Sequence, residues 1–329
     1  MPTSAAPTLG TVAELMGTTA HVVLTGPSAP DEGSGIERLR QLETRWSRFR
    51  DDSEVSRLNA AGGAPCVVSP DTATLIEMVR WAWYHTAGLF DPTVLDAVRA
   101  AGYDRSFDEL SITADALPSA SEPSETLPAP GAGGITVDPT TGLVQLPDDV
   151  RLDPGGIGKG LAADLCATAA VDAGADGALV SVGGDLRVAG EAPPQGWEIE
   201  LDHHVVASAR VNLRVGALAT STTLRRRWQT RRGIAHHVID PRTGRPSNSP
   251  VVACSVIAGQ AWWAEALATA LIVSGGPVSA DAPGSASDEE STPDWDALLT
   301  DTGALLTFSD GTSRAVGAHA GSFSSTGRL

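Results

Sequence analysis

The sequence predicts an α/β (α+β) fold in which mixed sheets are flanked by helices. Segments with the two-residue alternation of strands occur between segments with the 3.6-residue period of helices. Most neighbouring strand-like segments are joined by short turns rich in Gly, Asp and Pro, which indicates hairpins rather than the long crossovers of a doubly wound sheet. The chain shows no internal repeat of fixed period. These observations favour an α/β unit with several hairpins.

The first half of the chain is expected to begin with one strand and three helices. Residues 18–25 (TTAHVVLT) alternate as a strand, and residues 35–50 place one apolar stripe on a helix. The residues of that stripe are Ile36, Leu39, Trp46 and Phe49. Ser69, a capping hydroxyl followed by proline, begins a second helix that ends near Gly88. A short third helix is expected at 93–101.

The rest of the chain is expected to consist mainly of strands. A hairpin is predicted at 135–147, and a Gly-rich turn then begins a helix that ends near Gly174. A further helix is predicted at 261–275, and a final hairpin at 304–316. Single strands are expected at 177–190 with a Gly-Gly interruption, at 197–201, at 210–220, at 235–241 and at 251–259.

The domain organisation is expected to be simple. Residues 10–329 are predicted to form one domain. Residues 111–134 and 276–294 are rich in Ser, Pro, Ala, Gly and acidic residues, and both are expected to be flexible surface insertions.

The charge of the chain argues against nucleic acid as a partner. The formal net charge is −17, and an acidic surface repels nucleic-acid phosphates. Residues 225–232 (RRRWQTRR) are the basic exception. A solvated hairpin or loop is the favoured interpretation of this segment, and a local contact with an anion or nucleotide is the alternative.

The cysteines and the amino terminus indicate a reducing compartment. Cys66, Cys166 and Cys254 are far apart and odd in number, which favours buried thiols over disulfides or a metal cluster. The first residues contain no secretory signal, and no segment is long and apolar enough to cross a bilayer. We therefore expect a cytoplasmic protein without a membrane span.

Residues 151–165 (RLDPGGIGKGLAADL) combine glycines, a lysine and the start of a helix. The segment is not a Walker A loop, because that motif needs Gly at the position of Asp153 and Ser or Thr at Gly160. It also lacks the glycine that the dinucleotide fingerprint needs at Leu161. A Gly-rich turn at a helix start can bind an anion through backbone N–H groups, and Lys159 adds a full positive charge. A purely structural turn explains the glycines almost as well.

Three further motifs have both a functional and an ordinary structural interpretation. Glu265 and Thr269 are four residues apart on a predicted helix and offer the hard oxygen ligands that Mg²⁺ prefers, although such pairs also occur on ordinary surface helices. His236 and His237 enter an Asp-Pro turn, and only one of them is expected to face a cleft, because neighbours on a strand point in opposite directions. Either histidine could act as an acid or base, or simply flank the turn. The GLFDPTV segment at 88–94 is on its own a helix end and a turn.

The ordered set of these motifs resembles the FAD:protein FMN transferases of the ApbE type. The motifs that carry the resemblance are MGTTAHV, RFRDDSEVSRLN, GLFDPTV, LDPGGIGKGLAADL, ALVSVGGDLRVAG, ALATS, HHVIDPRTGRP and AEALATALIVSG. The resemblance implies a two-lobed architecture similar to the T-fold, with FAD bound between the lobes. It also implies a Mg²⁺-dependent transfer of FMN from FAD to a threonine hydroxyl of an acceptor flavoprotein, with release of AMP.

The resemblance assigns roles to individual residues. It places the metal at the carbonyl of Gly156 and the side chains of Glu265 and Thr269, and it makes His237 the catalytic residue. The positions expected to contact FAD or to lie near it are Met16, Phe49, Asn59, Leu89, Phe90, Asp91, Thr93, Asp153, Lys159, Asp164, Ser221, Val238 and Asp240.

Two positions depart from the pattern of the family that the sequence resembles. Glu265 stands where the family usually has Asp, and its extra methylene moves the carboxylate by about 1.5 Å. Since Mg²⁺ prefers near-ideal octahedral geometry, two alternatives stay open. One is an FAD pyrophosphatase that gives FMN and AMP, and the other is a non-catalytic FAD-binding protein. Gly158 stands where many relatives have Ala before the lysine.

Overall fold

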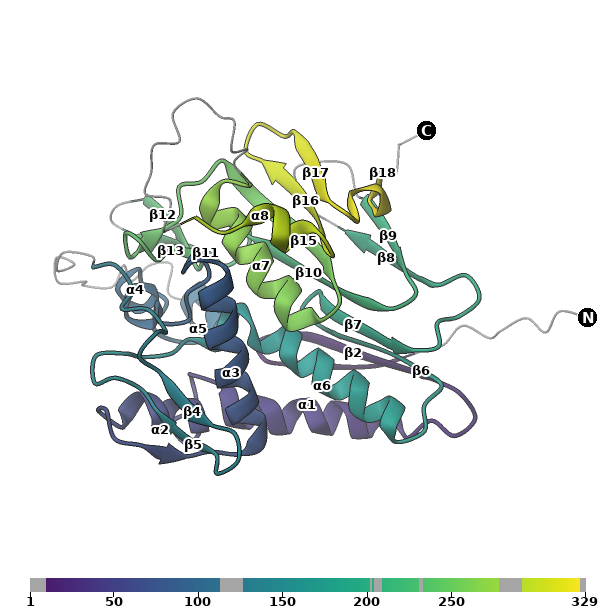
Figure 1. The fold of residues 1–329 in the computed structure, drawn as a ribbon, viewed down its shortest axis with the longest axis horizontal. Coiled ribbons are helices and arrows are strands. Elements are labelled where there is room, and N and C mark those ends of the chain that lie inside the picture. Colours follow the sequence, from purple (N-terminus) through teal and green to yellow (C-terminus); the bar gives the residue numbers. More distant parts are fainter. Residues whose placement is uncertain are drawn as a thin grey trace, which may run out of the picture.

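The computed structural model describes residues 10–112, 127–201, 203, 209–230, 233–277 and 292–325. An eight-stranded sheet forms its centre (Figure 1). In spatial order its strands are β1 (Thr11–Leu15), β2 (Thr18–Thr25), β6 (Gly177–Val182), β7 (Asp185–Gly190), β10 (Gly216–Thr222), β15 (Val251–Ala258), β16 (Gly303–Phe308) and β17 (Ser313–Gly317).

The predicted α+β class is confirmed. Throughout the described ranges every strand ladder is antiparallel, so hairpins rather than crossovers dominate the sheet. The strand at 18–25 and the hairpin at 304–316 lie where the sequence predicts them. The single interrupted strand predicted at 177–190 is instead the hairpin β6–β7. Gly183 and Gly184 both adopt positive φ, which a two-residue turn between strands requires and which glycine adopts without strain.

Two long helices cover one face of the central sheet. Helix α6 (Gly158–Asp172) packs on β6 and β7, and α7 (Ala261–Ser274) packs on β10 and β15. The two helices also contact each other, and α1 (Glu32–Trp46) lies along α6 (Figure 1). Helix α7 is buried on most sides, as its continuous apolar sequence requires. This arrangement brings the amino-terminal turns of α6 and α7 together.

The opposite face of the central sheet carries a second, smaller sheet. Its strands are β8 (Trp197–Leu201), β9 (Ala209–Leu213) and β18 (Ser324–Ser325). The segment predicted as one strand at 210–220 is therefore two strands, β9 and β10, which belong to different sheets. The apolar core between the sheets consists of Leu186, Val188, Leu201, Ala209, Val211, Leu213, Leu218 and Ile257.

The remaining elements lie at one end of the sheet and at its rim (Figure 1). The three-stranded sheet within residues 66–145 packs against the helix at 70–85. This end of the molecule is consistent with the expected second lobe. The bounds of these elements are α2 (Glu54–Ala60), β3 (Cys66–Val67), α3 (Pro70–His85), α4 (Leu95–Ala100), α5 (Phe107–Ile112), β4 (Thr136–Asp138), β5 (Leu143–Gln145), β11 (Arg227–Thr230), β12 (Gly233–His236), β13 (Ile239–Asp240), β14 (Arg245–Pro246), α8 (Trp295–Leu299) and two 3₁₀ turns, η1 (Pro154–Gly156) and η3 (Ala320–Ser322).

Helix α1 differs from its predicted bounds at both ends. It begins at Glu32, because the side chain of Asp31 caps the helix by accepting a hydrogen bond from the N–H of Gly33. It ends at Trp46, because Ser47 takes an extended conformation. Phe49 is thus not part of the helical stripe in the core; 43% of its surface is exposed. The capping of α3 by Ser69 is as predicted.

The two predicted insertions lie largely outside the described residues. Residues 113–126 and 278–291 are not described. The end of the first predicted insertion is not a surface loop, because Ala132 is completely buried and the N–H of Gly131 donates to Thr93 Oγ1 at 2.9 Å. The ordered core therefore resumes before residue 134.

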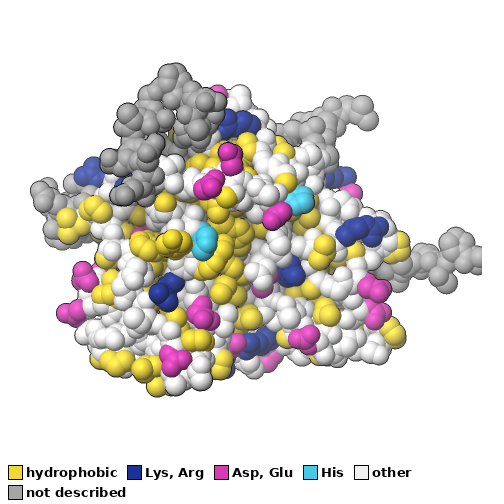
Figure 2. Space-filling view, viewed as in Figure 1, with side chains coloured by type: hydrophobic (Ala, Val, Ile, Leu, Met, Phe, Trp, Pro, Cys, Tyr) yellow, Lys and Arg dark blue, Asp and Glu magenta, His cyan; other side chains and the backbone are white. Residues whose placement is uncertain are grey.

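The cysteines, the charged surface and the helix lengths agree with what the composition indicates. All three cysteines are free, and Cys166 and Cys254 are buried. Figure 2 shows acidic side chains spread over one face, with a band of hydrophobic side chains near its middle. None of the helices in the described ranges has the length and apolar character needed to cross a bilayer.

Candidate active site

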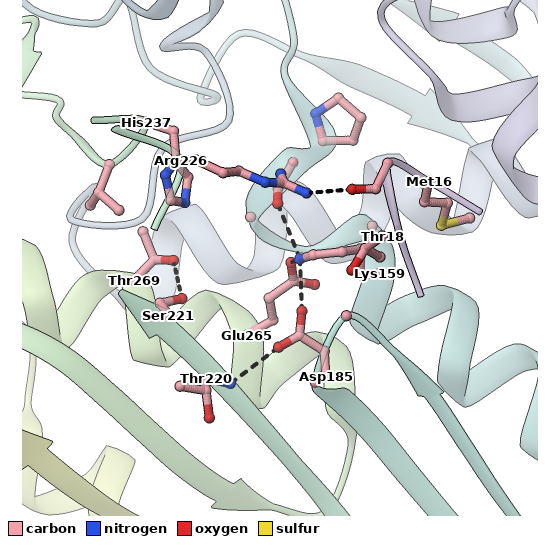
Figure 3. Close-up of a pocket in the computed structure, with 18 of the residues that line it drawn as sticks. Met16, Thr18, Lys159, Asp185, Thr220, Ser221, Arg226, His237, Glu265 and Thr269 are labelled. Carbon is pink, nitrogen blue, oxygen red and sulfur yellow. Dashed lines mark hydrogen bonds and ion pairs between the residues drawn. The ribbon is translucent and has the colours of Figure 1, made fainter. Parts of the chain in front are cut away.

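A cavity of about 1000 Å³ opens where the Gly-rich turn, the start of α7 and the β6–β7 turn meet (Figure 3). It is large enough for a dinucleotide-sized ligand, since small-molecule sites usually measure about 300–1,000 Å³. Thirteen of the seventeen site residues that the sequence suggests line it: Met16, Phe49, Leu89, Phe90, Asp91, Asp153, Gly156, Lys159, Ser221, His237, Val238, Glu265 and Thr269.

The Gly-rich turn is held in shape by its own aspartate. The carboxylate of Asp153 accepts a hydrogen bond from the N–H of Gly155 at 2.9 Å and so caps η1. Its other oxygen pairs with the Nε of Arg48 at 3.1 Å, and the Arg48 side chain is only 5% exposed. Asp153 therefore shapes the turn from inside the cavity wall, and a nearby buried guanidinium offsets its charge.

Helices α6 and α7 meet closely because position 160 has no side chain. A Cβ atom on Gly160 would lie 2.4 Å from the carbonyl oxygen of Ala261, closer than real contacts allow. Asp164, one turn further along α6, accepts hydrogen bonds from the N–H groups of Ala261 and Trp262 at 3.0 and 2.9 Å. It thus caps α7 from another helix. Burial raises the pKa of Asp164 to about 6, although these two donors oppose the rise.

This helix contact creates a buried charge cluster around Lys159. Its Nζ lies 2.7 Å from Asp185 Oδ2, makes a short contact with Glu265 Oε1 and lies 3.5 Å from the carbonyl oxygen of Gly155. The second carboxylate oxygen of Glu265 accepts from the N–H of Gly160 at 2.8 Å. Burial alone would lower the pKa of Lys159, but Asp185 and Glu265 outweigh it and raise that pKa. Burial raises the pKa of Glu265, against the opposing effect of Lys159.

Oxygen donors also gather one helical turn beyond Glu265. The hydroxyls of Thr269 and Ser221 are 3.1 Å apart. A Cβ atom on Gly156 would lie 3.8 Å from Thr269 Oγ1 and 3.1 Å from the Phe90 ring, so the Gly-rich turn and α7 converge as the sequence suggests. Across the described ranges no three His, Cys, Asp or Glu side chains cluster as a metal site. Carbonyl, hydroxyl and carboxylate oxygens are nevertheless a donor set that suits Mg²⁺. The Gly155 carbonyl and the carboxylates of Asp185 and Glu265 already surround a cation, the Lys159 ammonium.

An apolar and aromatic wall lies on the other side of the Gly-rich turn. The ring centroids of Phe49 and Tyr103 are 5.8 Å apart, and the Arg48 guanidinium lies 4.1 Å from the Phe49 centroid. Leu89 and Phe90 follow a turn in which Ala87 and Gly88 have positive φ. Such a wall can bind the flat face of an aromatic ligand.

Met16 and Asp91 are held by neighbouring side chains. The N–H of Met16 donates to Glu43 Oε1 at 2.8 Å, which fixes a turn where Met16 has a positive φ of 52°. Asp91 is buried and accepts from Thr93 N–H, Thr93 Oγ1 and the Trp83 indole. Burial raises the pKa of Asp91 against these donors.

Only one of the paired histidines lines the cavity. His237 follows the end of β12 and lies among the lining residues, whereas His236 Nε2 lies 3.1 Å from the carbonyl oxygen of Ser247. Burial, together with the smaller effect of the positive charges of Arg226, His236 and Lys159, lowers the pKa of His237 to about 3. Its Nδ1 is buried without a hydrogen-bond partner in the described structure, so it can accept a proton from a bound group.

Four of the suggested residues do not line the cavity but support its walls. Asn59 bonds to both the N–H and the carbonyl of Leu152, and Thr93 holds Asp91. Asp164 caps α7, and Asp240 pairs with Arg242 in the turn after β13. The resemblance expects these four residues at FAD or near it. The hydrogen bonds that they form are with the backbone and with neighbouring residues.

Several lining residues were missed from the sequence, among them Asp185, Arg48 and Arg226. Asp185 lies in the motif GGDLRV. An acidic residue that follows two glycines inside an apolar segment could have indicated a side chain that lines the cavity. Arg48 and Arg226 also line the cavity. Arg226 belongs to the basic segment RRRWQTRR, whose described residues form β11 and the turn before it. Because β11 pairs with β12, the segment is part of a hairpin, as the favoured interpretation expects. Arg231 and Arg232 lie outside the described residues.

Comparisons with known proteins agree on one family. A family model described as the ApbE family matches residues 16–282. The chain is 30% identical over 253 residues to the FAD:protein FMN transferase of Treponema pallidum, covering 72% of this chain and 69% of that protein. It is 29% identical over 273 residues to the one of Vibrio cholerae, covering 79% of each. The match to the Rhodobacter capsulatus protein, 32% identical over 244 residues, covers 72% of this chain but only 45% of that protein.

Solved structures show the same fold. An ApbE protein of Thermotoga maritima superposes with a TM-score of 0.75 at 24% identity, covering 93% of this chain and 96% of that one. A flavin transferase ApbE from Vibrio cholerae gives a TM-score of 0.71 at 22% identity, covering 96% of this chain and 98% of that one.

Proposed function

The chain belongs to the ApbE family, and from this premise we propose that it transfers FMN from FAD to a threonine hydroxyl of an acceptor flavoprotein, with Mg²⁺ and with release of AMP. The coarser part of this statement, that the protein is a flavin transferase, follows from the names of its relatives. The observation that carries the finer part is the cavity. It joins an aromatic wall to a cluster of charged groups and oxygen donors, as a flavin linked to a pyrophosphate requires.

The flavin and the pyrophosphate would occupy different walls of the cavity. The flavin ring would lie against Phe49, Leu89 and Phe90, which are apolar and line the cavity. The phosphates would lie near the Gly-rich turn, where Lys159 carries the positive charge that their oxygens need. Binding energy from the ring would then hold the phosphates in place for reaction.

The proposed step breaks one bond and forms one bond. The acceptor hydroxyl oxygen attacks the flavin-side phosphorus, and the bond from that phosphorus to the bridging oxygen breaks. The electron pair stays on the bridging oxygen, which leaves as part of AMP. The hydroxyl proton passes to the unpartnered Nδ1 of His237. Negative charge from the bound pyrophosphate would raise the low pKa of His237 towards the range of a useful base.

The Gly156 carbonyl, Glu265 and Thr269 would hold the magnesium ion. When bound, Mg²⁺ would supply charge neutralisation at the pyrophosphate oxygens. Lys159 would keep its position beside this site through Asp185, which binds the ammonium from the opposite side. The Ser221 hydroxyl, 3.1 Å from Thr269 Oγ1, would orient that hydroxyl.

A mass spectrum tests this function directly. The protein is incubated with FAD, an acceptor flavoprotein and either Mg²⁺ or EDTA. We expect covalent FMN on an acceptor threonine, with an equal amount of AMP, only when Mg²⁺ is present. Free FMN and AMP, formed at the same rate without acceptor, would replace the transferase by an FAD pyrophosphatase.

One contact favours a second candidate, an FAD-binding protein without catalysis. Both carboxylate oxygens of Glu265 already have partners, Lys159 and the N–H of Gly160, so the carboxylate is less available to a metal. This candidate predicts that FAD stays intact with Mg²⁺ and that Glu265→Asp starts its turnover. Calorimetric titration with Mg²⁺ would then detect tighter binding in Glu265→Asp than in the unmodified chain. Turnover of FAD by the unmodified chain excludes this candidate.

A further inference from the structure

Arg226 has an unusual backbone conformation inside the cavity wall. It lies in the turn between β10 and β11 and has a φ of +48°, a left-handed value that a bulky residue adopts only at a cost in strain. Its Nη2 donates to the carbonyl oxygen of Gly17, 209 residues away in sequence, at 3.2 Å. Gly17 follows Met16, which also has a positive φ. The guanidinium thus reaches across the cavity between two strained turns (Figure 3).

The charge of Arg226 is not balanced within the described part of the chain. Among the described residues, the one hydrogen bond of its guanidinium goes to a neutral carbonyl, and the guanidinium forms no ion pair with a described carboxylate. Lys159, by contrast, contacts two carboxylates. A guanidinium that lines a cavity and has only a weak neutral acceptor is suited to an anionic ligand, because its planar fork binds two oxygens of one phosphate.

We propose that Arg226 is a catalytic residue that leaves the Gly17 carbonyl and donates hydrogen bonds to the pyrophosphate oxygens of FAD. This inference rests on the proposed function. As the bond between the flavin-side phosphorus and the bridging oxygen breaks, negative charge grows on the departing AMP phosphate. Arg226 stabilises that charge, while the proton of the acceptor hydroxyl goes to His237. Of the two interpretations of the basic segment, the anion contact then holds for Arg226.

The location of Arg226 supports this role. Arg226 and Lys159 are both close enough to His237 for their charges to act on its imidazole. Both also line the cavity, one from the β10–β11 turn and one from α6. Two cations from different parts of the chain can thus reach one pyrophosphate. The next residue, Arg227, is exposed on β11 and does not line the cavity, which makes it a matched control.

Calorimetry with ADP and with riboflavin tests this proposal, because only ADP has a pyrophosphate. The full chain, with Mg²⁺, is compared with Arg226→Gln, Arg226→Gly and Arg227→Gln. Arg226→Gly is included because glycine adopts positive φ without strain, so this variant keeps the turn. We expect both Arg226 variants to bind ADP about 10- to 100-fold more weakly, the range for a hydrogen bond to a charged group. Riboflavin affinity should not change, and Arg227→Gln should behave as the unmodified chain.

Three results would overturn the proposal. The first is unchanged ADP affinity in both Arg226 variants. The second is an equal loss of riboflavin and ADP affinity, which would mean that Arg226 only supports the shape of the cavity. The third is an equal loss of ADP affinity in Arg227→Gln, which would mean a general surface charge effect. Failure of the proposed function has a different signature, because the unmodified chain would then bind ADP through Arg226 but transfer no FMN from FAD to the acceptor threonine.

Discussion

The ammonium of Lys159 and the carboxylate of Asp185 lie 2.7 Å apart, although they belong to different layers of the fold. Lys159 is in the first turn of α6, and Asp185 is the first residue of β7. The other oxygen of Asp185 accepts from the N–H of Thr220 on the neighbouring strand at 3.1 Å. The Lys159 side chain is thereby fixed to the central sheet as well as to Glu265 on α7.

Replacing Asp185 is expected to slow the reaction more than it weakens flavin binding. Asp185→Asn removes the charge that holds Lys159 on the sheet side, so the ammonium can move towards Glu265. We expect a fall in kcat of about 10- to 100-fold, the range for a lost charged hydrogen bond, with little change in riboflavin affinity. The measurement is AMP release from saturating FAD in the presence of Mg²⁺ and the acceptor flavoprotein.

Asp104→Asn is the matched control for this change. Asp104 is half exposed and pairs with Arg105 on the surface. Its replacement should leave AMP release unchanged, because exposed ion pairs contribute little. If Asp185→Asn folds normally and releases AMP at the unmodified rate, Asp185 does not position Lys159 for the reaction.

Two glycines of the same turn should differ sharply in their tolerance of alanine. A Cβ on Gly160 would lie within 2.7 Å of three backbone atoms of Ala261 and Trp262, so Gly160→Ala must push α6 and α7 apart. A Cβ on Gly158 would meet nothing closer than 3.6 Å, the Pro154 Cβ. Gly158→Ala also lowers the entropy of the unfolded chain.

Thermal unfolding followed by circular dichroism checks this contrast. Gly160→Ala should lower the free energy of unfolding by about 1–3 kcal/mol or more, as overpacking usually does. Gly158→Ala should be neutral or stabilising by about 0.4–1 kcal/mol. Equal effects of the two changes would mean that the helix contact at Gly160 is not as close as described.

Local sequence signals were sufficient where a helix or strand is defined by its own residues. Ser69 caps α3 as predicted, and the alternation at 18–25 gives β2. The same signals failed at Phe49, because an apolar side chain that lines a cavity has the same helical spacing as one that faces the core. The sequence predicts one interrupted strand at Gly183 and Gly184, because it does not give their φ angles, which decide the direction of the chain beyond them.

Sequence motifs predicted those parts of the candidate site in which one short segment contributes several lining residues. The Gly-rich turn and α7 each contribute such a set, and the set from one lies against the set from the other. Asp185 and Arg226 were missed, because their roles depend on contacts with Lys159 and Gly17, which are distant in sequence. Asp164 was placed at the ligand, because a buried carboxylate in a motif has the same sequence pattern whether it binds a ligand or caps a helix.

Asp164 should make stability depend on pH in a defined direction. Burial raises its pKa from 3.8 to about 6 in the folded protein. Between these values the folded state binds more protons at this position than the unfolded state does. The contribution of Asp164 to the free energy of unfolding is therefore greatest below pH 4, falls as the pH rises to 6 and is constant above it.

Urea unfolding of Asp164→Asn and the unmodified chain measures this effect. Asparagine cannot ionise, and its amide leaves one backbone N–H of α7 without an acceptor, at a cost of about 1 kcal/mol at every pH. The stability of Asp164→Asn relative to the unmodified chain should therefore improve between pH 4 and pH 7. A constant difference over that range would show that Asp164 titrates alike in both states.

His237→Ala is expected to abolish transfer while FAD still binds. The imidazole presents an unpartnered Nδ1 in the cavity, and its low pKa keeps it neutral at pH 7. Nδ1 can therefore take the proton of the acceptor hydroxyl once the bound pyrophosphate has raised this pKa. Loss of a general base usually lowers a rate about 10²- to 10⁴-fold. Flavin contacts come from Phe49, Leu89 and Phe90 and remain in place. Transfer is measured by mass spectrometry of the acceptor, and FAD binding by quenching of flavin fluorescence.

His236→Ala separates the chemical role of the pair from its structural role. His236 does not line the cavity, and its Nε2 holds the carbonyl of Ser247 beyond the β13–β14 turn. This variant should unfold at a lower temperature but transfer FMN at nearly the unmodified rate. If both variants lose FAD binding and transfer to the same extent, the segment serves to shape the cavity, and the proton must pass to another group. A loss of transfer confined to His237→Ala means that the proton of the acceptor hydroxyl passes to the His237 imidazole. The comparison is direct, because the two histidines are adjacent in sequence and only the His237 side chain faces the cavity.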